Sequence, residues 1–296
     1  MEAGNKNRNT LVSVVIPSYN HQDYIKESIL SAVNQTYPAI ELIVIDDGSK
    51  DHSPEILRDL QEQYGFTLIC QENQGLSKTL NKAIREYTHG KYIAVLASDD
   101  YWMKEKIEKQ VDFLEENDEF ALVFGKAYPV SKSGEILENT FVVDTVTDLT
   151  FEALIEKNPI PATTVMFRKE VWKECGGFNE DSYIEDWELW LKIVFRYKIA
   201  YLDEYFTYYR IHGKNMSSNV LKLYTCMREI VYRWKDKMDE PMARKVLARR
   251  DSITFNVLAR KHKKESLRYI DLSYSYLDRF ILLNYIKGVY KLLFIW

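Results

Sequence analysis

Short apolar runs rich in β-branched residues alternate with stretches of helical periodicity through the first hundred residues, and this alternation constrains the fold most. Runs such as LVSVVI at 11–16 and IELIVI at 40–45 are typical of buried strands. Strands that alternate with helices pair in parallel and are joined by right-handed crossovers. The sequence therefore predicts an α/β fold, with a Rossmann-like, mostly parallel sheet and flanking helices. Strands are expected at 11–16, 40–45, 66–70 and 91–96, and helices at 23–34, 54–64 and 76–88.

The pattern changes after residue 100, and from about residue 218 onward only helical periodicity is visible. We therefore expect a disordered N-terminus at 1–10, one α/β domain at 11–217 and a helical C-terminal extension at 218–296. Further helices are expected at 104–116 and 184–197, and further strands at 120–124, 163–167 and 205–211.

Charge is divided unevenly along the chain, whose net charge is -4. Residues 220–296 hold 17 Lys and Arg against 8 Asp and Glu, a net charge of +9, which leaves -13 on residues 1–219. A basic, aromatic segment beside an acidic body predicts that the segment meets something anionic. The acidic body and the lack of a known binding motif argue against a nucleic-acid partner.

The cysteines and the N-terminus indicate the compartment. Cys70, Cys175 and Cys226 stand too far apart for a disulfide framework or a zinc ribbon, which favours a reducing cytosol. The first ten residues, MEAGNKNRNT, have no apolar core and do not predict a signal peptide. No apolar run approaches the length of about 18 residues that a membrane span requires. We therefore expect a cytoplasmic protein.

Two pairs of carboxylates follow two different predicted strands. Asp46 and Asp47 end the second strand, and Asp99 and Asp100 follow the fourth. Each pair alone has an ordinary explanation, a turn for the first and a helix N-terminus for the second. In parallel sheets, however, ligands bind beyond the carboxyl ends of the strands. Together the pairs predict a site for a divalent metal, Mg²⁺ or Mn²⁺, and a polyol or nucleotide.

Five motifs carry a family resemblance, in the order VVIPSYNHQDYIKESILSAVNQTYPAIELIVIDDGSKD, NQGLSKTLNKAI, GKYIAVLASDDYW, GGFNEDSYIEDWELWLK and YYRIHGKNMS. In sequence and order they resemble the family 2 glycosyltransferases of the GT-A fold. The resemblance covers roughly residues 11–217. It implies that this region binds a nucleotide sugar and catalyses the transfer of its sugar.

The resemblance implies a donor site at the end of the first strand. In this family that loop cradles the base and ribose of a nucleotide sugar, usually a UDP-sugar. The ring of Tyr19 would stack on the uracil, and Asp47 would accept a hydrogen bond from the uracil N3–H. Core packing is the alternative for Tyr19. The residues expected to contact the donor are Pro17, Ser18, Tyr19, Asp47, Lys78, Ser98, Asp99, Asp100 and Arg210.

The resemblance also implies a metal site. The family motif is commonly Asp-x-Asp-Asp, but here it reads Ala97-Ser98-Asp99-Asp100. The loss at Ala97 removes a ribose or secondary metal contact, while the position usually bound to the metal is kept as Asp99. His212 would be a second ligand, with an ordinary structural role as its alternative. The metal would neutralise the departing diphosphate.

Glu185 and Asp186 match the ED motif of the family, ahead of an aromatic-rich helix. In the inverting mechanism one carboxylate takes the proton from the attacking acceptor hydroxyl. The family pattern assigns this role to Asp186, with Glu185 in support. An acidic residue at a helix N-terminus is the alternative reading for both.

Together these features predict a metal-dependent, inverting glycosyltransferase that moves a hexosyl unit from a UDP-sugar to a saccharide hydroxyl. The acceptor is expected to be linked to a polyprenyl diphosphate, as in O-antigen or capsule biosynthesis. One alternative is a sugar-nucleotide pyrophosphorylase, although the loop PSYNHQDY lacks the Gly and the basic residues that a triphosphate needs. The other is a sugar-nucleotide-binding protein that has lost its activity.

The basic C-terminal extension has two interpretations. Tyr, Trp, Lys and Arg side chains favour peripheral attachment to the anionic inner face of the cytoplasmic membrane. The alternatives are a helical cap on the catalytic domain and an oligomer contact.

Overall fold

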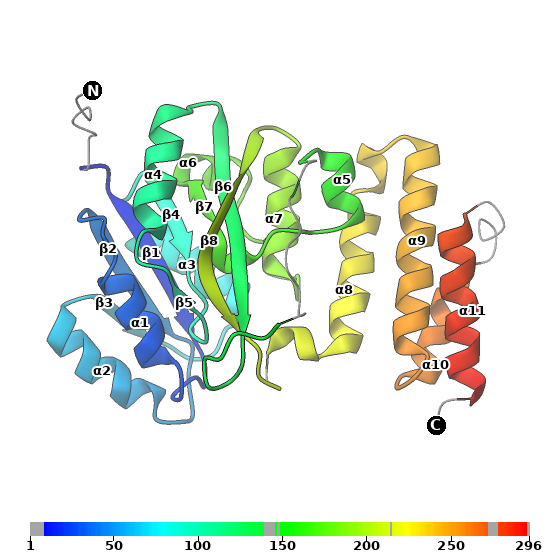
Figure 1. Ribbon diagram of the computed structural model, residues 1–296, viewed down its shortest axis with the longest axis horizontal. Helices are drawn as coiled ribbons and strands as arrows, with labels where there is room; N and C mark the ends of the chain where they lie inside the picture. The colour runs from blue at the N-terminus through cyan, green and yellow to red at the C-terminus, as the bar shows by residue number, and fades with distance from the viewer. Residues whose placement is uncertain (1–8, 139–145, 147–148, 214, 272–277, 295–296) are drawn as a thin grey trace. The chain divides into compact units, whose positions relative to one another are not determined.

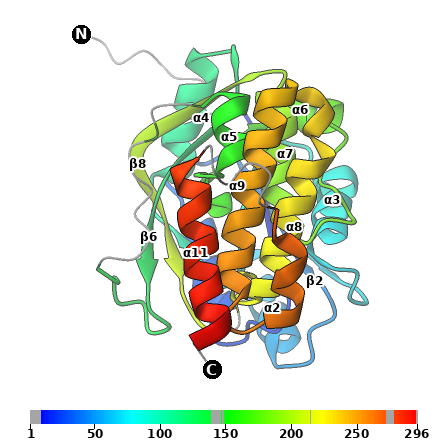
Figure 2. The same ribbon diagram turned by 90° about the vertical axis from the view of Figure 1, so that its right-hand side faces the viewer.

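The computed structural model (Figures 1 and 2) describes residues 9–138, 146, 149–213, 215–271 and 278–294. The chain divides into two units, which we call the sheet unit and the helical unit. The sheet unit comprises Met1–Leu154, Asn158–Asp181 and Glu185–His212, and the helical unit Ile155–Lys157, Ser182–Ile184 and Gly213–Trp296. The predicted limits of the catalytic domain and its extension stay predictions, and residues 1–8 of the predicted disordered N-terminus lie outside the described residues.

An eight-stranded sheet with the order β3-β2-β1-β4-β7-β6-β8-β5 forms the centre of the sheet unit. The pairs β1–β2, β2–β3, β1–β4 and β6–β8 are parallel, while β7 and β5 pair antiparallel with their neighbours. The predicted α/β class with a mostly parallel sheet is therefore confirmed. The strands are β1 Val12–Ser18, β2 Ile40–Asp46, β3 Thr67–Cys70, β4 Tyr92–Val95, β5 Tyr101–Trp102, β6 Phe120–Val130, β7 Met166–Arg168 and β8 Lys198–Arg210.

Helices cover both faces of this sheet because alternate strand residues point to opposite sides. On one face, Val12, Val14 and Ile16 of β1 join a buried cluster that includes Ile25 and Ile107. On the other face, α3 packs against β1 and β2. The helices are α1 Ile25–Val33, α2 Ser53–Tyr64, α3 Leu76–Tyr87, α4 Lys106–Glu116, α5 Phe151–Glu156, α6 Lys169–Glu174 and α7 Glu185–Val194.

The late strands are where the sequence predictions were least accurate. β6 runs to Val130 instead of 124, and β8 begins at Lys198 instead of 205. Gly125 and Pro129 are poor strand formers, so the sequence pattern does not predict the second half of β6. Gly125 is needed there, since a Cβ at this position would lie 2.6 Å from a Phe206 ring atom. The strand predicted at 163–167 is a 3₁₀ turn, Ala162–Thr164, followed by β7.

The helical unit is built on close packing of two long helices. α8 Val220–Arg233, α9 Glu240–Leu258, α10 Lys263–Ser266 and α11 Arg279–Phe294 follow one another. Asp239 caps α9 by accepting a hydrogen bond from the backbone N–H of Met242 at 2.8 Å. Ile281 and Tyr285 of α11 pack with Phe255 of α9 in a small buried cluster. No helix in the described part of the chain has both the length and the apolarity to cross a membrane.

Gly288 sets how closely α11 approaches α9, because a Cβ there would lie 2.4 Å from the Phe255 ring. We expect Gly288→Ala to lower the unfolding free energy by about 1–3 kcal/mol, since overpacking a buried contact costs that much. Thermal denaturation followed by circular dichroism measures the change. Val289→Ala, at a neighbouring exposed position of α11, is the control. Equal melting temperatures for the two variants would contradict this packing.

Candidate active site

The crevice between β1 and β4 is the switch point of the sheet, because the chain leaves β1 toward β2 and later returns on the other side of β1 as β4. Open α/β sheets bind ligands at such points, beyond the carboxyl ends of the strands. Two loops start there, after Ser18 of β1 and after Val95 of β4. The side chains of these loops are therefore the first candidates for a site.

The loop after β1 is clamped to the loop after β2 by reciprocal hydrogen bonds. Asn20 N–H donates to Ser49 Oγ at 2.9 Å, and Lys50 N–H donates to Asn20 Oδ1 at 2.7 Å. His21 N–H donates to Ser53 Oγ at 3.1 Å. Asn20 holds a left-handed backbone conformation, with φ of 55°, which Asn tolerates better than most residues. The backbone that carries His21 is thus fixed before any ligand binds.

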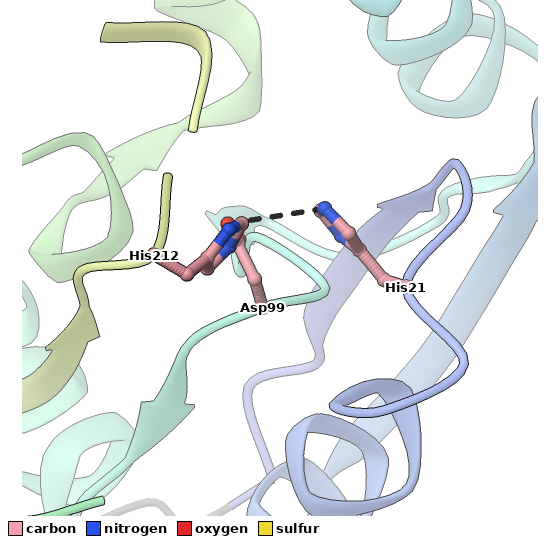
Figure 3. A group of neighbouring side chains, drawn as sticks. All are labelled: His21, Asp99 and His212. Carbon is pink, nitrogen blue, oxygen red and sulfur yellow. Dashed lines mark hydrogen bonds and ion pairs between the residues drawn. The ribbon is translucent and has the colours of Figure 1, made fainter. Parts of the chain in front are cut away.

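Two imidazoles and a carboxylate converge at the switch point (Figure 3). His212 Nε2 lies 3.0 Å from Asp99 Oδ2, and His21 Nε2 lies 4.0 Å from the same oxygen. On its other side, the His21 ring places Nδ1 2.7 Å from Ser98 Oγ. The ring of Tyr24 stacks on His212, with 4.9 Å between the ring centroids. Three segments far apart in the sequence therefore meet in one cluster.

Asp99 and Asp100 have opposite electrostatic environments although they are neighbours. Burial opposes the ionisation of Asp99, but the hydrogen bond with His212 and the charge of His21 outweigh it, so the pKa of this carboxyl is lowered. Burial, reinforced by the charge of Asp99, raises the pKa of the Asp100 carboxyl well above its usual value. Asp99 is therefore the anionic member of the pair.

Arg210 lies at the end of β8 and is almost fully buried. Its guanidinium donates to the carbonyl oxygen of Asp99 at 2.9 Å, to that of Lys132 at 2.8 Å and to the Glu27 carboxylate. Its backbone N–H donates to Asp100 Oδ1 at 2.8 Å. A guanidinium engaged in this way positions the loop after β4. Its predicted contact with the donor stays a prediction.

Asp46 and Asp47 organise the loops after β2 and β3. Asp46 Oδ2 accepts a hydrogen bond from the backbone N–H of Ser49 at 3.1 Å. Asp47 Oδ1 accepts from Gln71 Nε2 at 2.8 Å and from Gln74 N–H at 2.9 Å, and its Oδ2 accepts from Gly75 N–H at 2.9 Å. Asp47 is therefore part of a second bonded group, which fixes the segment leading into α3.

The remaining predicted donor contacts differ in accessibility. Tyr19 is exposed, at 45%, so its ring is available for stacking, and Lys78 is exposed on α3. Pro17 is half-buried next to Ser18, which is fully buried. The buried atoms Ser18 Oγ and Asp46 Oδ1 have no hydrogen-bond partner within the part of the chain that the structure describes. Buried polar atoms without partners mark places where a ligand or water fits.

Glu185 and Asp186 begin α7 and line a small cavity whose other walls are apolar. Burial, with the charge of Asp186 added, raises the pKa of Glu185 to about 8. Burial raises the pKa of Asp186 to about 6, although its carboxylate accepts the backbone N–H of Trp187 at 2.6 Å. The residues that line this cavity include neither Asp99 nor Asp47. The apolar walls are Leu80, Val95, Ala162, Val165, Phe167, Phe178 and Trp190.

The donor set at the switch point fits a divalent metal ion. One ligand atom each from His21, Asp99 and His212 lies within 4.8 Å of the others. Imidazole nitrogen and carboxylate oxygen are common ligands of first-row divalent metals. The sequence analysis named Asp99 and His212 but missed His21. Its position in PSYNHQDY, directly after the first strand, was the signal available in the sequence.

Comparisons with known proteins give a consistent result. Residues 13–175 match the sequence profile described as Glycosyl transferase family 2. The putative teichuronic acid biosynthesis glycosyltransferase TuaG of Bacillus subtilis (strain 168) is 32% identical over 215 residues, which cover 72% of this chain and 83% of the relative. The UDP-Glc:alpha-D-GlcNAc-diphosphoundecaprenol beta-1,3-glucosyltransferase WfaP of Escherichia coli is 32% identical over 220 residues, which cover 72% of this chain and 82% of the relative.

Solved structures share the fold. S. aureus TarS 1-349 in complex with UDP-GlcNAc superimposes with a TM-score of 0.69 at 20% identity, covering 94% of this chain and 89% of that one. The mannosyltransferase PcManGT from Pyrobaculum calidifontis, in complex with GDP-Man and Mn²⁺, has a TM-score of 0.61 at 14% identity, covering 97% and 88%. The similarity confirms the predicted GT-A fold.

The raised pKa of Glu185 predicts how stability depends on pH. Between pH 4.5 and about 8 this carboxyl ionises in the unfolded chain but stays protonated in the fold, so its contribution to stability is lost across that range. We expect Glu185→Gln to raise the melting temperature above that of the wild type, by an amount that grows from pH 5 to pH 8 and then levels off. Glu62→Gln, at an exposed position of α2, is the control. A constant difference across this pH range would contradict the prediction.

Proposed function

This chain belongs to the family 2 glycosyltransferases, and on that premise we propose that it transfers a hexosyl unit from a UDP-sugar to a saccharide hydroxyl with inversion. The observation that carries the proposal is the anionic Asp99 at the switch point, between two imidazoles and above the ends of β1 and β4. A diphosphate and its metal ion are the chemical groups that such a cluster suits. Because the chain belongs to this family, we do not retain the alternative of a sugar-nucleotide pyrophosphorylase. An inactive sugar-nucleotide-binding protein stays as the second candidate because of Ala97.

The support for a UDP-sugar comes from the loops after β1 and β2. The exposed Tyr19 ring offers a stacking surface for a base, and Ser18 Oγ is a buried polar atom in need of a partner. Asp47 stays our proposed acceptor for uracil N3–H, because a carboxylate accepts about four hydrogen bonds and three donors to it are described. The names of WfaP and of the TarS complex include a UDP-sugar.

Asp99 and His212 would hold the metal ion, which we expect to be Mg²⁺ or Mn²⁺. When bound, the ion would stabilise the negative charge of the departing diphosphate. The protein holds the two ligand side chains in place through contacts with other residues. Arg210 fixes the carbonyl of Asp99, and Tyr24 fixes the ring of His212, so both ligands are oriented in advance.

Asp186 is the proposed base, with Glu185 beside it in support. Burial raises the pKa of both carboxyls, and the charge of Asp186 raises the pKa of Glu185 further, so the pair favours holding one proton over carrying two negative charges. Two neighbouring acids that share one proton can divide base and support roles between them. Asp186 would accept the proton of the attacking hydroxyl, and Glu185 would stay neutral beside it. Inversion would follow if the hydroxyl that Asp186 deprotonates attacks the anomeric carbon from the face opposite the departing diphosphate.

The acceptor is proposed to be a lipid-linked saccharide at the inner face of the cytoplasmic membrane. The name of WfaP specifies a diphosphoundecaprenol acceptor. In this chain, α11 buries one apolar side against α9 and exposes another, with Arg279 and Lys287 exposed on the same helix. An exposed apolar strip with basic neighbours fits an anionic bilayer surface better than water. The exposed apolar side chains of α11 are Phe280, Leu282, Leu283, Ile286, Val289, Tyr290, Leu293 and Phe294.

Release of UDP from a panel of UDP-sugars, with and without EDTA, tests the reaction. We expect release with a saccharide acceptor present and its loss when EDTA removes the metal. Binding of UDP without release from any member of the panel would favour the inactive binding protein. Release that is unchanged by EDTA would contradict metal dependence.

Asp186→Asn removes the proposed base without changing its size. We expect transfer to fall by at least about 10²-fold, since a positioned base contributes about 10²–10⁴-fold, while the affinity for UDP changes little. Isothermal titration with UDP and an assay of transferred sugar measure the two effects. Asp181→Asn, at an exposed position nearby in the sequence, is the control. A large loss of UDP affinity would place Asp186 on the donor side instead.

The double variant Ile286→Glu/Leu293→Glu places two negative charges on the exposed apolar strip of α11. We expect sedimentation with vesicles of phosphatidylglycerol and phosphatidylcholine to fall by at least about tenfold, because burial of apolar area and attraction to anionic lipid are both lost. The control adds the same charges to exposed residues of the sheet unit, as Tyr64→Glu/Ile136→Glu. Unchanged vesicle binding would leave the helical unit as a cap or an oligomer contact.

A further inference from the structure

We propose that His21 is a third protein ligand of the metal ion. This inference rests on the proposed function, which supplies Asp99 and His212 as the other ligands. The resulting set of two imidazoles and one carboxylate favours Mn²⁺ over Mg²⁺.

The distances around His21 are compatible with its binding a metal ion together with Asp99 and His212. A metal bound at about 2.1 Å by each of two ligands leaves their atoms about 3.0 to 4.2 Å apart. The Nε2 atom of His21 lies 4.0 Å from Asp99 Oδ2, and the corresponding distance for His212 is 3.0 Å. All three ligand atoms lie within 4.8 Å of one another, so movements below about 1 Å complete the set.

The other side of the His21 ring is held in the way that metal-binding imidazoles are held. With a metal on Nε2, the ring proton is on Nδ1, which then donates to Ser98 Oγ at 2.7 Å. Ser98 stands between Ala97 and Asp99, so this bond ties His21 to the metal-binding loop itself. The backbone N–H of His21 is fixed in turn by Ser53. Both the ring and the backbone are therefore set before metal binding.

Ala97 leaves its position of the loop after β4 without a side-chain ligand atom. The family motif commonly has Asp at this position, but the methyl group of Ala97 offers no donor atom. The backbone of Ala97 is used within the fold, where its carbonyl accepts from Ser28 Oγ at 3.3 Å. His21 brings its nitrogen to the same loop from the other side of the crevice, after β1. His21 thus offers a nitrogen ligand beside a position that has no side-chain oxygen.

This nitrogen ligand affects which metal the site prefers. Mg²⁺ is bound mainly through oxygen atoms and keeps several waters, whereas imidazole suits the softer first-row metals. Two imidazoles and one carboxylate therefore bind Mn²⁺ better than Mg²⁺. His21→Asp replaces an imidazole nitrogen with a carboxylate oxygen and is expected to shift the metal preference toward Mg²⁺.

Binding of MnCl₂ in the presence of UDP, followed by electron paramagnetic resonance, tests the proposal without an activity assay. We expect His21→Ala to weaken Mn²⁺ binding by at least about tenfold, within the range of about 10–100-fold seen for changes around a metal site. Electron spin echo modulation should show ¹⁴N couplings from two imidazoles in the wild type and from one in the variant. His52→Ala removes an exposed imidazole from the neighbouring loop and is the matched control.

The outcomes separate this inference from the proposed function. If the wild type binds Mn²⁺ and His21→Ala keeps the same affinity and the same couplings, His21 is not a ligand. The proposal that Asp99 and His212 hold the metal ion is then unaffected. If the wild type binds no Mn²⁺ with UDP, the metal part of the proposed function fails and this inference fails with it. His21→Gln is a second variant that keeps a polar side chain of similar length, and thermal denaturation of each variant confirms folding.

Discussion

The candidate site depends on the hydrogen bonds that the buried guanidinium of Arg210 makes. It bonds to the Asp99 carbonyl, to the Lys132 carbonyl and to the carboxylate of Glu27, and thereby joins the end of β8 to the loops after β4 and β6 and to α1. The Glu27 side chain is 55% exposed, so the ion pair itself adds little net stability. The hydrogen bonds to the two carbonyl oxygens are what fix the loops beside Asp99.

The sheet unit places some carboxyl groups in charged surroundings and others in apolar surroundings. Around Asp99, hydrogen bonds and imidazoles keep a carboxylate ionised. Around Glu185 and Asp186, apolar walls that include Phe167 and Trp190 raise both pKa values. In the proposed reaction, stabilisation of the leaving group would use the first environment, and proton uptake near neutral pH would use the second. Both follow from burial, with opposite results because only Asp99 has cationic or hydrogen-bonding partners strong enough to compensate.

The sequence predicted most of the fold and part of the site, for reasons that differ between residues. The first four strands were predictable because β-branched runs and turn residues are local signals. The second half of β6 was not, because Gly125 and Pro129 contradict strand propensity, and the pairing of this half with β8 is a contact between segments distant in the sequence. Asp99 and His212 were found through a family motif, but His21 was missed, since its importance depends on a crossover that brings two loops together. The pKa values of Glu185 and Asp186 depend on walls from distant segments, which no local pattern contains.

The order of the strands has a consequence for biosynthesis. β8 lies between β6 and β5 in the sheet, and β5 pairs with β8. His212 follows β8 directly, so its imidazole can reach Asp99 only after this strand has left the ribosome and entered the sheet. A nascent chain that ends before residue 198 can already form the parallel strands β1 to β4, yet it lacks the last imidazole. The cluster of His21, Asp99 and His212 is thus completed only when the last long strand of the sheet has been added.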